Sequence, residues 1–288
     1  KYEQGVQGLR LILWGMFKKV VIADSLGWRV DLVFEGYQSM DGGVLLLGLV
    51  YFAFQIYCDF SGYSDIAIGT AKLFGIELMS NFKFPYFSRN IGEFWRRWHI
   101  SLSSWFRDYL YIPIGGSKGG TWISIRNIFV IFIISGLWHG SNWTFFMWGL
   151  AHSLYYLPLF LLGKNRQYIA DDVAENNWYP SIKEFFQMGV TFLSTMIAWV
   201  FFRSNSISDS FNYLYLLFIK ISIPTDNRGG IVFIFILVMF DWIMRKNERE
   251  PLYLQNKYLR WSLYTGLMLL IIGHFNIIDE YPFIYFQF

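Results

Sequence analysis

Long apolar runs alternate with short charged segments along most of the chain. Four of the runs contain no Asp, Glu, Lys or Arg, and they cover residues 127–163, 185–202, 229–240 and 261–278. A helix needs about 20 mostly apolar residues to cross the hydrocarbon core of a bilayer, so runs of this length are typical of membrane-spanning helices. The pattern therefore predicts an all-α fold and a polytopic membrane protein.

The run from Asn127 to Gly163 is too long for one straight span. Gly136 and Gly140 lie on either side of His139 within it, and glycine allows a helix to break or two helices to approach closely. We expect one helix, a break near the middle of the membrane and a second helix. The pattern then predicts, in order, a polar loop over 164–184, a span over 185–202, an amphipathic segment over 209–221, a span over 229–244, a charged loop over 245–260 and a last span over 261–278.

The first third of the chain is apolar but carries embedded charges. Residues 8–26 contain two lysines and an aspartate, which favours an interfacial or partly buried helix over a simple span. Residues 42–58 form a candidate span, and Asp59 and Asp65 follow it within apolar sequence. Carboxylates inside a membrane are costly and usually face a cavity or a partner. We expect these two to be structural, bonded to helix termini or to arginines across the bundle.

The stretch from Glu93 to Gly116 concentrates aromatic and charged residues between the apolar runs. On a single helix from Trp95 to Tyr109, at about 100° per residue, the aromatic residues share one face with His99. The arginines and Asp108 then lie on the two flanks of that face. Such a helix suits a membrane interface or the wall of an internal cavity, with arginines reaching lipid head groups or an anionic ligand.

Composition narrows the class of function. The chain of 288 residues is 55% hydrophobic and 22% aromatic, and its net charge of +3 is too small to indicate nucleic-acid binding. Basic residues cluster in 83–126, 164–183 and 245–260, with two predicted spans between successive clusters. The positive-inside rule places all three clusters on the cytoplasmic side. A single cysteine excludes an internal disulfide, and neither an HExxH motif nor a Cys-His cluster indicates a metal site.

Histidines are the candidates for chemistry. His139 lies in an apolar, glycine-flanked segment and His99 lies on the aromatic face, and for both a functional and a packing role are open. His152 and His274 lie in apolar runs without a supporting motif, which favours packing. A histidine base acting on a bound hydroxyl needs no metal and no protein nucleophile, but it needs a dry cavity and groups that stabilise developing charge. This chemistry points to acyl transfer without excluding other reactions.

Five segments resemble a known family in order along essentially the whole chain. They are residues 8–26, 57–76, 81–116, 136–140 and 283–288. Together they are similar to the alginate O-acetyltransferase (AlgI-type) branch of the membrane-bound O-acyltransferases, the MBOAT family. The resemblance implies one domain over residues 1–288, a funnel-shaped helical ring around a tunnel, and a multi-pass protein of the bacterial inner membrane. The family is normally longer at its N-terminus, so several of its helices would be missing here.

The resemblance also implies a site and a reaction. The family's catalytic histidine, in its WHG motif, falls on His139, and its second signature histidine, in its WRRWHISLS motif, falls on His99. We expect acetyl groups from cytoplasmic acetyl-CoA to cross the membrane, where a periplasmic SGNH-type partner places them on an exported polysaccharide such as alginate. His139 acts either as the general base on the acceptor hydroxyl or as a relay of the acetyl group, and His99 positions or polarises the thioester carbonyl.

Other residues of the same motifs are candidates for supporting roles. The candidates for binding substrate or donor are Arg96, Arg107, Trp138 and Trp95. For the two arginines, anchoring of the interfacial helix to phosphate of the membrane lipid is an equal alternative. Asp108 joins the two intramembrane aspartates as a structural or supporting residue. No bound cofactor and no metal are expected.

Two rival functions stay open. A related branch transfers D-alanine from a carrier protein to teichoic acid, and it has a similar RWH and WH arrangement. The segments YCDFSGYSD and RDYLYIPIGG favour the AlgI-type branch over it. The second rival is a non-catalytic transporter or channel subunit, in which His139 would be dispensable. The absence of an internal repeat counts against that second reading.

Overall fold

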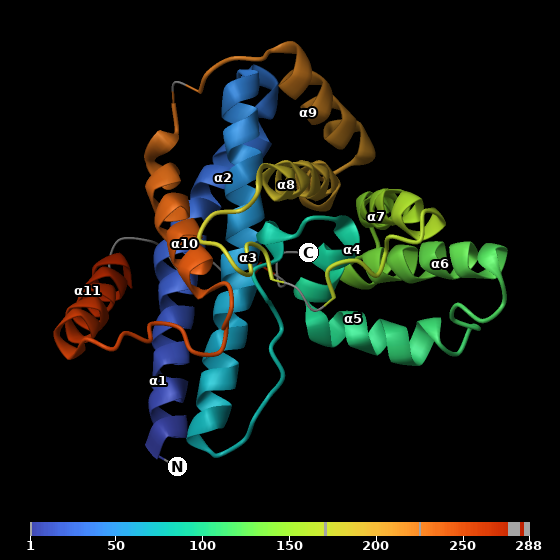
Figure 1. Ribbon diagram of the computed structural model, residues 1–288. Coiled ribbons are helices and arrows are strands. Elements are labelled where there is room, and N and C mark those ends of the chain that lie inside the picture. The colour runs from blue at the N-terminus through green and yellow to red at the C-terminus, as the bar shows by residue number, and fades with distance from the viewer. Residues whose placement is uncertain (1, 170–171, 225, 276–282, 285–288) are drawn as a thin grey trace. The chain divides into compact units, whose positions relative to one another are not determined.

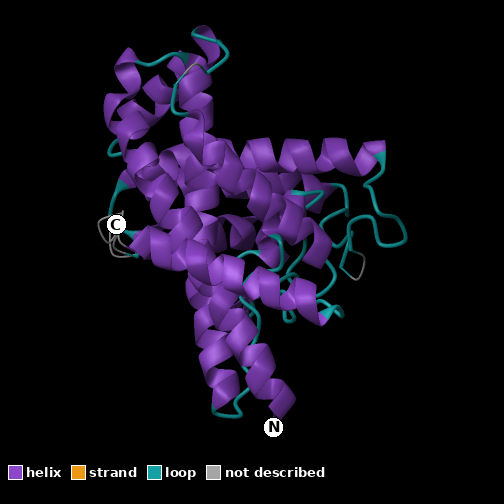
Figure 2. Cartoon of the chain, turned by 90° about the vertical axis from the view of Figure 1, so that its left-hand side faces the viewer, coloured by secondary structure: helices purple, strands orange, loops and turns teal. Residues whose placement is uncertain are grey.

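The computed structural model describes residues 2–169, 172–224, 226–275 and 283–284, and all regular elements within these ranges are helical (Figure 1, Figure 2). The predicted all-α fold is therefore confirmed. The chain divides into two compact units, of which one joins residues 1–81 to residues 220–288 and the other comprises residues 82–219.

The first unit is built on two long helical segments that pack side by side, α1 and α3 (Figure 1). Its elements are α1 (Tyr2–Met16), the π-helical turn η1 (Phe17–Ala23), α2 (Asp24–Gly36), η2 (Tyr37–Ser39), α3 (Gly42–Leu73), η5 (Arg228–Gly230), α10 (Ile231–Met244) and α11 (Lys257–Phe275). The backbones of α1 and α3 touch where glycines face each other. A Cβ on Gly8 would lie 2.6 Å from the carbonyl oxygen of Gly69, and a Cβ on Gly62 would lie 2.7 Å from that of Gly15. Small residues at such a contact let membrane helices approach closely.

Ion pairs between η1 and α3 hold the intramembrane aspartates. Lys18 Nζ lies 2.7 Å from Asp65 Oδ2, and Lys19 Nζ lies 2.6 Å from Asp59 Oδ1. Lys19 also binds Asp24 at 2.8 Å. The expectation of arginine partners is therefore wrong, because two consecutive lysines of η1 face α3 and pair with both carboxylates. The attraction within each pair offsets part of the cost of removing these charges from water.

The second unit contains both signature histidines. Its elements are η3 (Pro85–Phe87), α4 (Ile91–Arg97), α5 (Ile100–Phe106), the π-helical turn η4 (Arg107–Tyr111), α6 (Thr121–His139), α7 (Trp143–Leu161), α8 (Ile182–Arg203) and α9 (Ile207–Ile219). The expected break in the long apolar run is confirmed, because α6 ends at His139 and α7 begins at Trp143. The expected span over 185–202 is confirmed as a helix by α8, and the segment predicted as a loop separates α7 from α8.

Within the described residues, three helices are long and apolar enough to cross a membrane: α3, α6 and α8. The spans predicted at 229–244 and 261–278 differ from what the structure shows. α10 has 14 residues, because Gly229 and Gly230 form a separate 3-10 turn before it, and this is shorter than the ~20 residues of a typical span. α11 begins at Lys257 and includes Arg260, and it is not among the three. Residues 276–278 lie outside the described residues.

Lys18→Met is expected to lower the free energy of unfolding by about 3–5 kcal/mol, because Asp65 would stay buried without its counterion. The side chains of Lys18 and Asp65 are 4% and 17% exposed. Thermal unfolding of the detergent-purified protein measures the effect, with Lys118→Met at an exposed turn as the control. The double variant Lys18→Met with Asp65→Leu should recover most of the loss. Wild-type stability in the single variant would show that the pair contributes nothing.

Candidate active site

The predicted continuous helix from Trp95 to Tyr109 is wrong, because the backbone breaks at His99. α4 ends at Arg97, Trp98 is extended with φ −106° and ψ 128°, and His99 is left-handed with φ 44° and ψ 55°. Left-handed backbone is uncommon for a residue other than glycine and costs about 1–3 kcal/mol. The surrounding structure must therefore hold His99 in place.

The break also divides the aromatic face that a single helix would have formed. Trp98 is buried, whereas Trp105 and Tyr109 are 51% and 69% exposed. Trp105 and Tyr109, which follow the break, thus present their rings outward, although Phe106 between them is buried. Trp98 turns its ring into the unit and can contribute to a buried site.

His99 is enclosed by aromatic rings. His99 is 8% exposed, and its ring contacts those of Phe82 and Trp138, with centroids 6.4 and 6.5 Å away. The hydroxyl of Ser101 lies 3.5 Å from His99 Nδ1. Burial lowers the pKa of His99 to about 4, because the apolar surroundings disfavour the imidazolium. His99 is therefore a neutral imidazole at neutral pH.

His139 is the last residue of α6, at the break between α6 and α7. Gly140 continues in extended backbone, and Asn142 then caps α7 by accepting a hydrogen bond from the Thr144 N–H at 3.1 Å. The imidazole of His139 contacts four rings: Trp138 at 5.0 Å, Phe202 at 5.1 Å, Trp148 at 5.3 Å and Phe145 at 6.5 Å between centroids. His139 thus lies in aromatic surroundings like those of His99.

Glycines bring α6 and α7 into backbone contact next to His139. A Cβ on Gly136 would collide with the carbonyl oxygen of Phe145, and a Cβ on Gly149 would collide with that of Phe132. The sequence suggested a close approach at Gly136, and the structure shows which backbone it touches. This contact sets the position of the α6 end and therefore of His139.

One side chain joins the two histidines. The ring of Trp138 contacts both His99, at 6.5 Å, and His139, at 5.0 Å. A second series of ring contacts runs from Trp98 to Trp199 at 5.2 Å, from Trp199 to Trp148 at 5.9 Å, and from Trp148 to His139 at 5.3 Å. The structure therefore brings His99, His139 and Trp138 together in one aromatic cluster.

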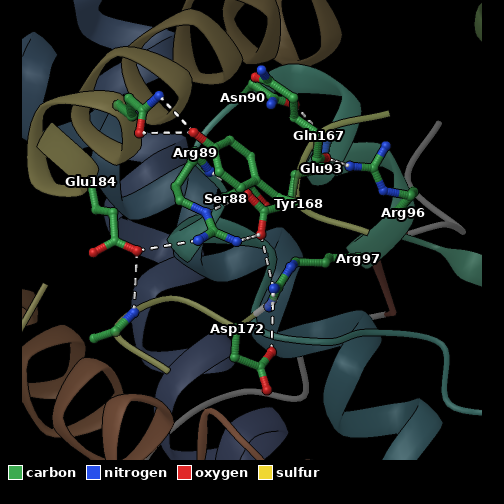
Figure 3. A network of polar contacts seen from close by, with 12 residues as sticks. Ser88, Arg89, Asn90, Glu93, Arg96, Arg97, Gln167, Tyr168, Asp172 and Glu184 are labelled. Atoms are coloured by element: carbon green, nitrogen blue, oxygen red, sulfur yellow. Dashed lines mark hydrogen bonds and ion pairs between the residues drawn. The ribbon is translucent and has the colours of Figure 1, made fainter. Parts of the chain in front are cut away.

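A buried ionic network around Glu93 supports α4 (Figure 3). Glu93 is fully buried and accepts hydrogen bonds from Arg89 Nη2 at 3.0 Å and from the Arg89 backbone N–H at 2.7 Å. Arg97 Nη2 lies 2.9 Å from the same carboxylate. Arg89 also pairs with Glu184 of α8 at 3.2 Å and lies over the ring of Tyr168 at 3.8 Å. These contacts tie α4 to α8 and to the loop between α7 and α8.

The arginines that the sequence proposed as donor ligands make contacts of a different kind. Arg96 donates to the carbonyl oxygens of Asn165 at 2.9 Å and Gln167 at 2.6 Å, which fastens the α7–α8 loop to α4. Arg107 pairs with its neighbour Asp108 at 2.7 Å on an exposed part of η4. Neither set of contacts involves the two signature histidines.

Sequence reasoning did not single out Trp98, Trp148 and Trp199, which line the cluster, and it gave His152 only a packing role. A usable signal was present in α7, where Trp148 and His152 are four residues apart and so share one face of a helix. Trp95 of α4 packs against this face of α7, because its indole N–H donates to His152 Nδ1 at 3.3 Å. Among the described residues, no group of three or more His, Cys, Asp or Glu is arranged to hold a metal ion.

Comparison with known proteins identifies relatives of this region. Residues 37–166 match the family model described as MBOAT, membrane-bound O-acyltransferase family. The probable alginate O-acetylase AlgI of Pseudomonas aeruginosa is 40% identical over 205 residues, covering 71% of this chain and 37% of that protein. The peptidoglycan O-acetyltransferase of Helicobacter pylori is 38% identical over 213 residues, covering 74% and 39%. A teichoic acid D-alanyltransferase of Streptococcus thermophilus is 28% identical over 210 residues, covering 66% and 51%.

The chain thus spans little more than a third of the length of the first two relatives. The matched region contains His99 and His139, together with Trp138 between them and His152. The similarity therefore covers the whole aromatic cluster around the two histidines except the residues that α8 contributes.

Gly136→Ala is expected to lower the free energy of unfolding by about 1–3 kcal/mol, because the new methyl group has no room against the Phe145 backbone. Gly189→Ala is the matched control, since a Cβ there meets nothing within 4 Å. That control should be neutral, or more stable by up to about 1 kcal/mol from helix propensity. Thermal unfolding compares the two. Equal effects of both variants would contradict a backbone contact between α6 and α7.

Glu93→Gln is expected to lower the free energy of unfolding by about 3–5 kcal/mol, because two arginines lose their shared carboxylate inside the unit. Asp108→Asn removes a carboxylate from an exposed pair and should change stability little. Chemical or thermal unfolding of both variants in the same detergent provides the comparison. If Glu93→Gln were as mild as the control, the network would not support α4.

Proposed function

We propose that the chain belongs to the membrane-bound O-acyltransferase family, whose model matches residues 37–166, and that the protein containing it is an O-acetyltransferase for an exported polysaccharide. The observation that supports the proposal most directly is the joint contact of Trp138 with His99 and His139. The alginate and peptidoglycan O-acetylating relatives point to a polysaccharide as the final acceptor.

In the proposed reaction His139 is the general base. It takes the proton of the acceptor hydroxyl while the hydroxyl oxygen attacks the carbonyl carbon of an acetyl thioester. The carbon–sulfur bond then breaks, and the thiolate leaves with the proton that His139 returns. The alternative, in which His139 itself carries the acetyl group between donor and acceptor, uses the same atoms in two steps.

His99 is proposed to assist at the carbonyl oxygen. A neutral imidazole can donate its N–H to an oxygen on which negative charge develops, and burial keeps His99 neutral. The aromatic rings beside both imidazoles are proposed to keep water from the thioester, which would strengthen such a hydrogen bond and protect the thioester from hydrolysis. Trp138, 55% exposed and in contact with both imidazoles, is proposed to border the acetyl group.

The setting of the reaction is part of the proposal. Acetyl-CoA is the proposed donor on the cytoplasmic side, and a periplasmic SGNH-type acetylase is the proposed partner on the other side of a bacterial inner membrane.

Arg96 is proposed to hold the α7–α8 loop in place, given its two contacts there, and not to bind donor phosphates. Arg107 and Asp108 lie at an exposed turn with outward-facing Trp105 and Tyr109, which suits contact with lipid head groups.

Two rivals are less well supported. The D-alanyl reading rests on a relative at 28% identity, against 40% and 38% for the O-acetylating relatives. A transporter or channel subunit is less well supported because the matching family model and the named relatives are all transferases or acetylases.

His139→Ala is expected to abolish acetylation of the exported polysaccharide, because the acceptor hydroxyl loses its base. The measurement is the acetyl-ester content of that polysaccharide in cells producing the variant at wild-type membrane levels. His99→Asn should reduce the content strongly without unfolding the protein, since Asn tolerates left-handed backbone.

His274→Gln is the matched control, since His274 lies in α11 and bonds to the Leu270 carbonyl oxygen of its own helix. It should leave acetylation unchanged. Wild-type acetyl content with His139→Ala would refute the acyltransferase proposal and favour the transporter reading. D-alanyl esters in place of acetyl esters would instead favour the rival branch.

A further inference from the structure

His152 is the histidine for which the sequence favoured a packing role, and its surroundings connect it to both signature histidines. It is fully buried in α7. Its ring contacts rings from three helices: Phe94 and Trp95 of α4 at 6.3 and 4.9 Å, Phe132 of α6 at 6.2 Å, and Trp148 of α7 at 4.9 Å. His152 therefore lies where the helix before His99 meets the two helices around His139.

Its two ring nitrogens have different surroundings. Nδ1 accepts a hydrogen bond from the indole N–H of Trp95 at 3.3 Å. An imidazole that accepts at Nδ1 and is uncharged carries its proton on Nε2. Nε2 is buried and has no hydrogen-bond partner among the described residues. The same is true of the indole N–H of Trp148, which is 1% exposed.

This arrangement is unfavourable for packing alone. A buried N–H without an acceptor is destabilising, and an apolar ring such as phenylalanine would fill the site without it. What histidine supplies, and phenylalanine cannot, is the Nδ1 acceptor that orients Trp95. Trp95 belongs to α4, four residues before His99, and Trp148 contacts both His152 and His139.

We propose that His152 is a positioning residue for acyl transfer, which fixes Trp95 of α4 and Trp148 of α7 and thereby sets the placement of His99 relative to His139. The inference rests on the proposed function. It assigns no contact between His152 and the reacting atoms. It predicts that loss of the Nδ1 acceptor slows the reaction while the fold persists.

His152→Phe and His152→Asn separate positioning from packing. Phenylalanine keeps a ring and removes the acceptor, whereas the Asn side chain is smaller but places an amide oxygen near the position of Nδ1. We expect the His152→Phe variant to be about as stable as wild type, because loss of the unpaired Nε2–H offsets the acceptor that Trp95 loses, and the His152→Asn variant to be less stable. We expect acetylation in the opposite order. His152→Phe should slow it by on the order of tenfold to a hundredfold, as for a small misplacement of catalytic groups, and His152→Asn should recover much of that loss.

Acetyl-ester formation on the exported polysaccharide is measured over time at matched membrane levels, with thermal unfolding in parallel. Trp95→Phe removes the donor of the same hydrogen bond. It replaces His152→Phe as the test if that variant does not fold. It should slow acetylation similarly, and combining it with His152→Phe should add little. Tyr155→Phe is the control, because Tyr155 also contacts the His152 ring, at 6.0 Å, and loses only a hydroxyl.

Two results would overturn the inference. One is wild-type acetylation with His152→Phe, and the other is acetylation that follows stability across the two His152 variants and Trp95→Phe. His139→Ala, tested in the same strains, separates this inference from the function on which it rests. If His139→Ala abolishes acetylation while the His152 variants retain it, only the positioning role fails. If all variants retain it, the proposed function fails.

Discussion

The left-handed backbone of His99 is the constraint around which the second unit is arranged. An L residue with φ 44° is strained by about 1–3 kcal/mol, so neighbouring contacts must maintain it. Asn90 caps the start of α4 by accepting from the Glu93 N–H at 2.8 Å, and the Glu93 carboxylate binds two arginines. These contacts fix both ends of α4. The chain then turns at His99, and the imidazole of His99 contacts the ring of Trp138. A continuous helix would have sent it along the face shared with the exposed Trp105.

The aromatic surroundings decide what kind of chemistry the histidines can support. Rings enclose both imidazoles, with Phe82 and Trp138 beside His99 and with Trp148 and Phe202 beside His139. An apolar enclosure keeps an imidazole neutral and strengthens any hydrogen bond it makes to a developing charge. The proposed acyl transfer needs a neutral base at His139 and a neutral hydrogen-bond donor at His99, and apolar surroundings favour the neutral form of an imidazole. Contacts among the same rings fix the position of one helix relative to the next, which is the basis of the role inferred for His152.

Apolar runs and glycines were sufficient to predict the helical fold, the break after His139 and the helix over 185–202, because each depends on local composition. The prediction failed where partners came from elsewhere in the chain. The partners of Asp59 and Asp65 are lysines of a π-helical turn, and no pattern in the sequence indicates which cations that turn presents. The continuous helix through Trp95 failed for the same reason, since helical periodicity carries no information about a strained residue that distant contacts stabilise.

Membrane character and the identity of the two signature histidines follow from the amino-acid sequence, because hydrophobic run lengths and motif residues are local properties. Which side chains surround those histidines was decided only by tertiary structure. Trp138 lies next to His139 in the sequence, yet its contact with His99 depends on how α4 and α6 pack. The sequence suggested Arg96 as an anion ligand, whereas in the structure its guanidinium donates hydrogen bonds to two carbonyl oxygens of the α7–α8 loop. His152 lacks any motif, and its link to Trp95 exists because α7 packs against α4, a contact between residues 57 positions apart.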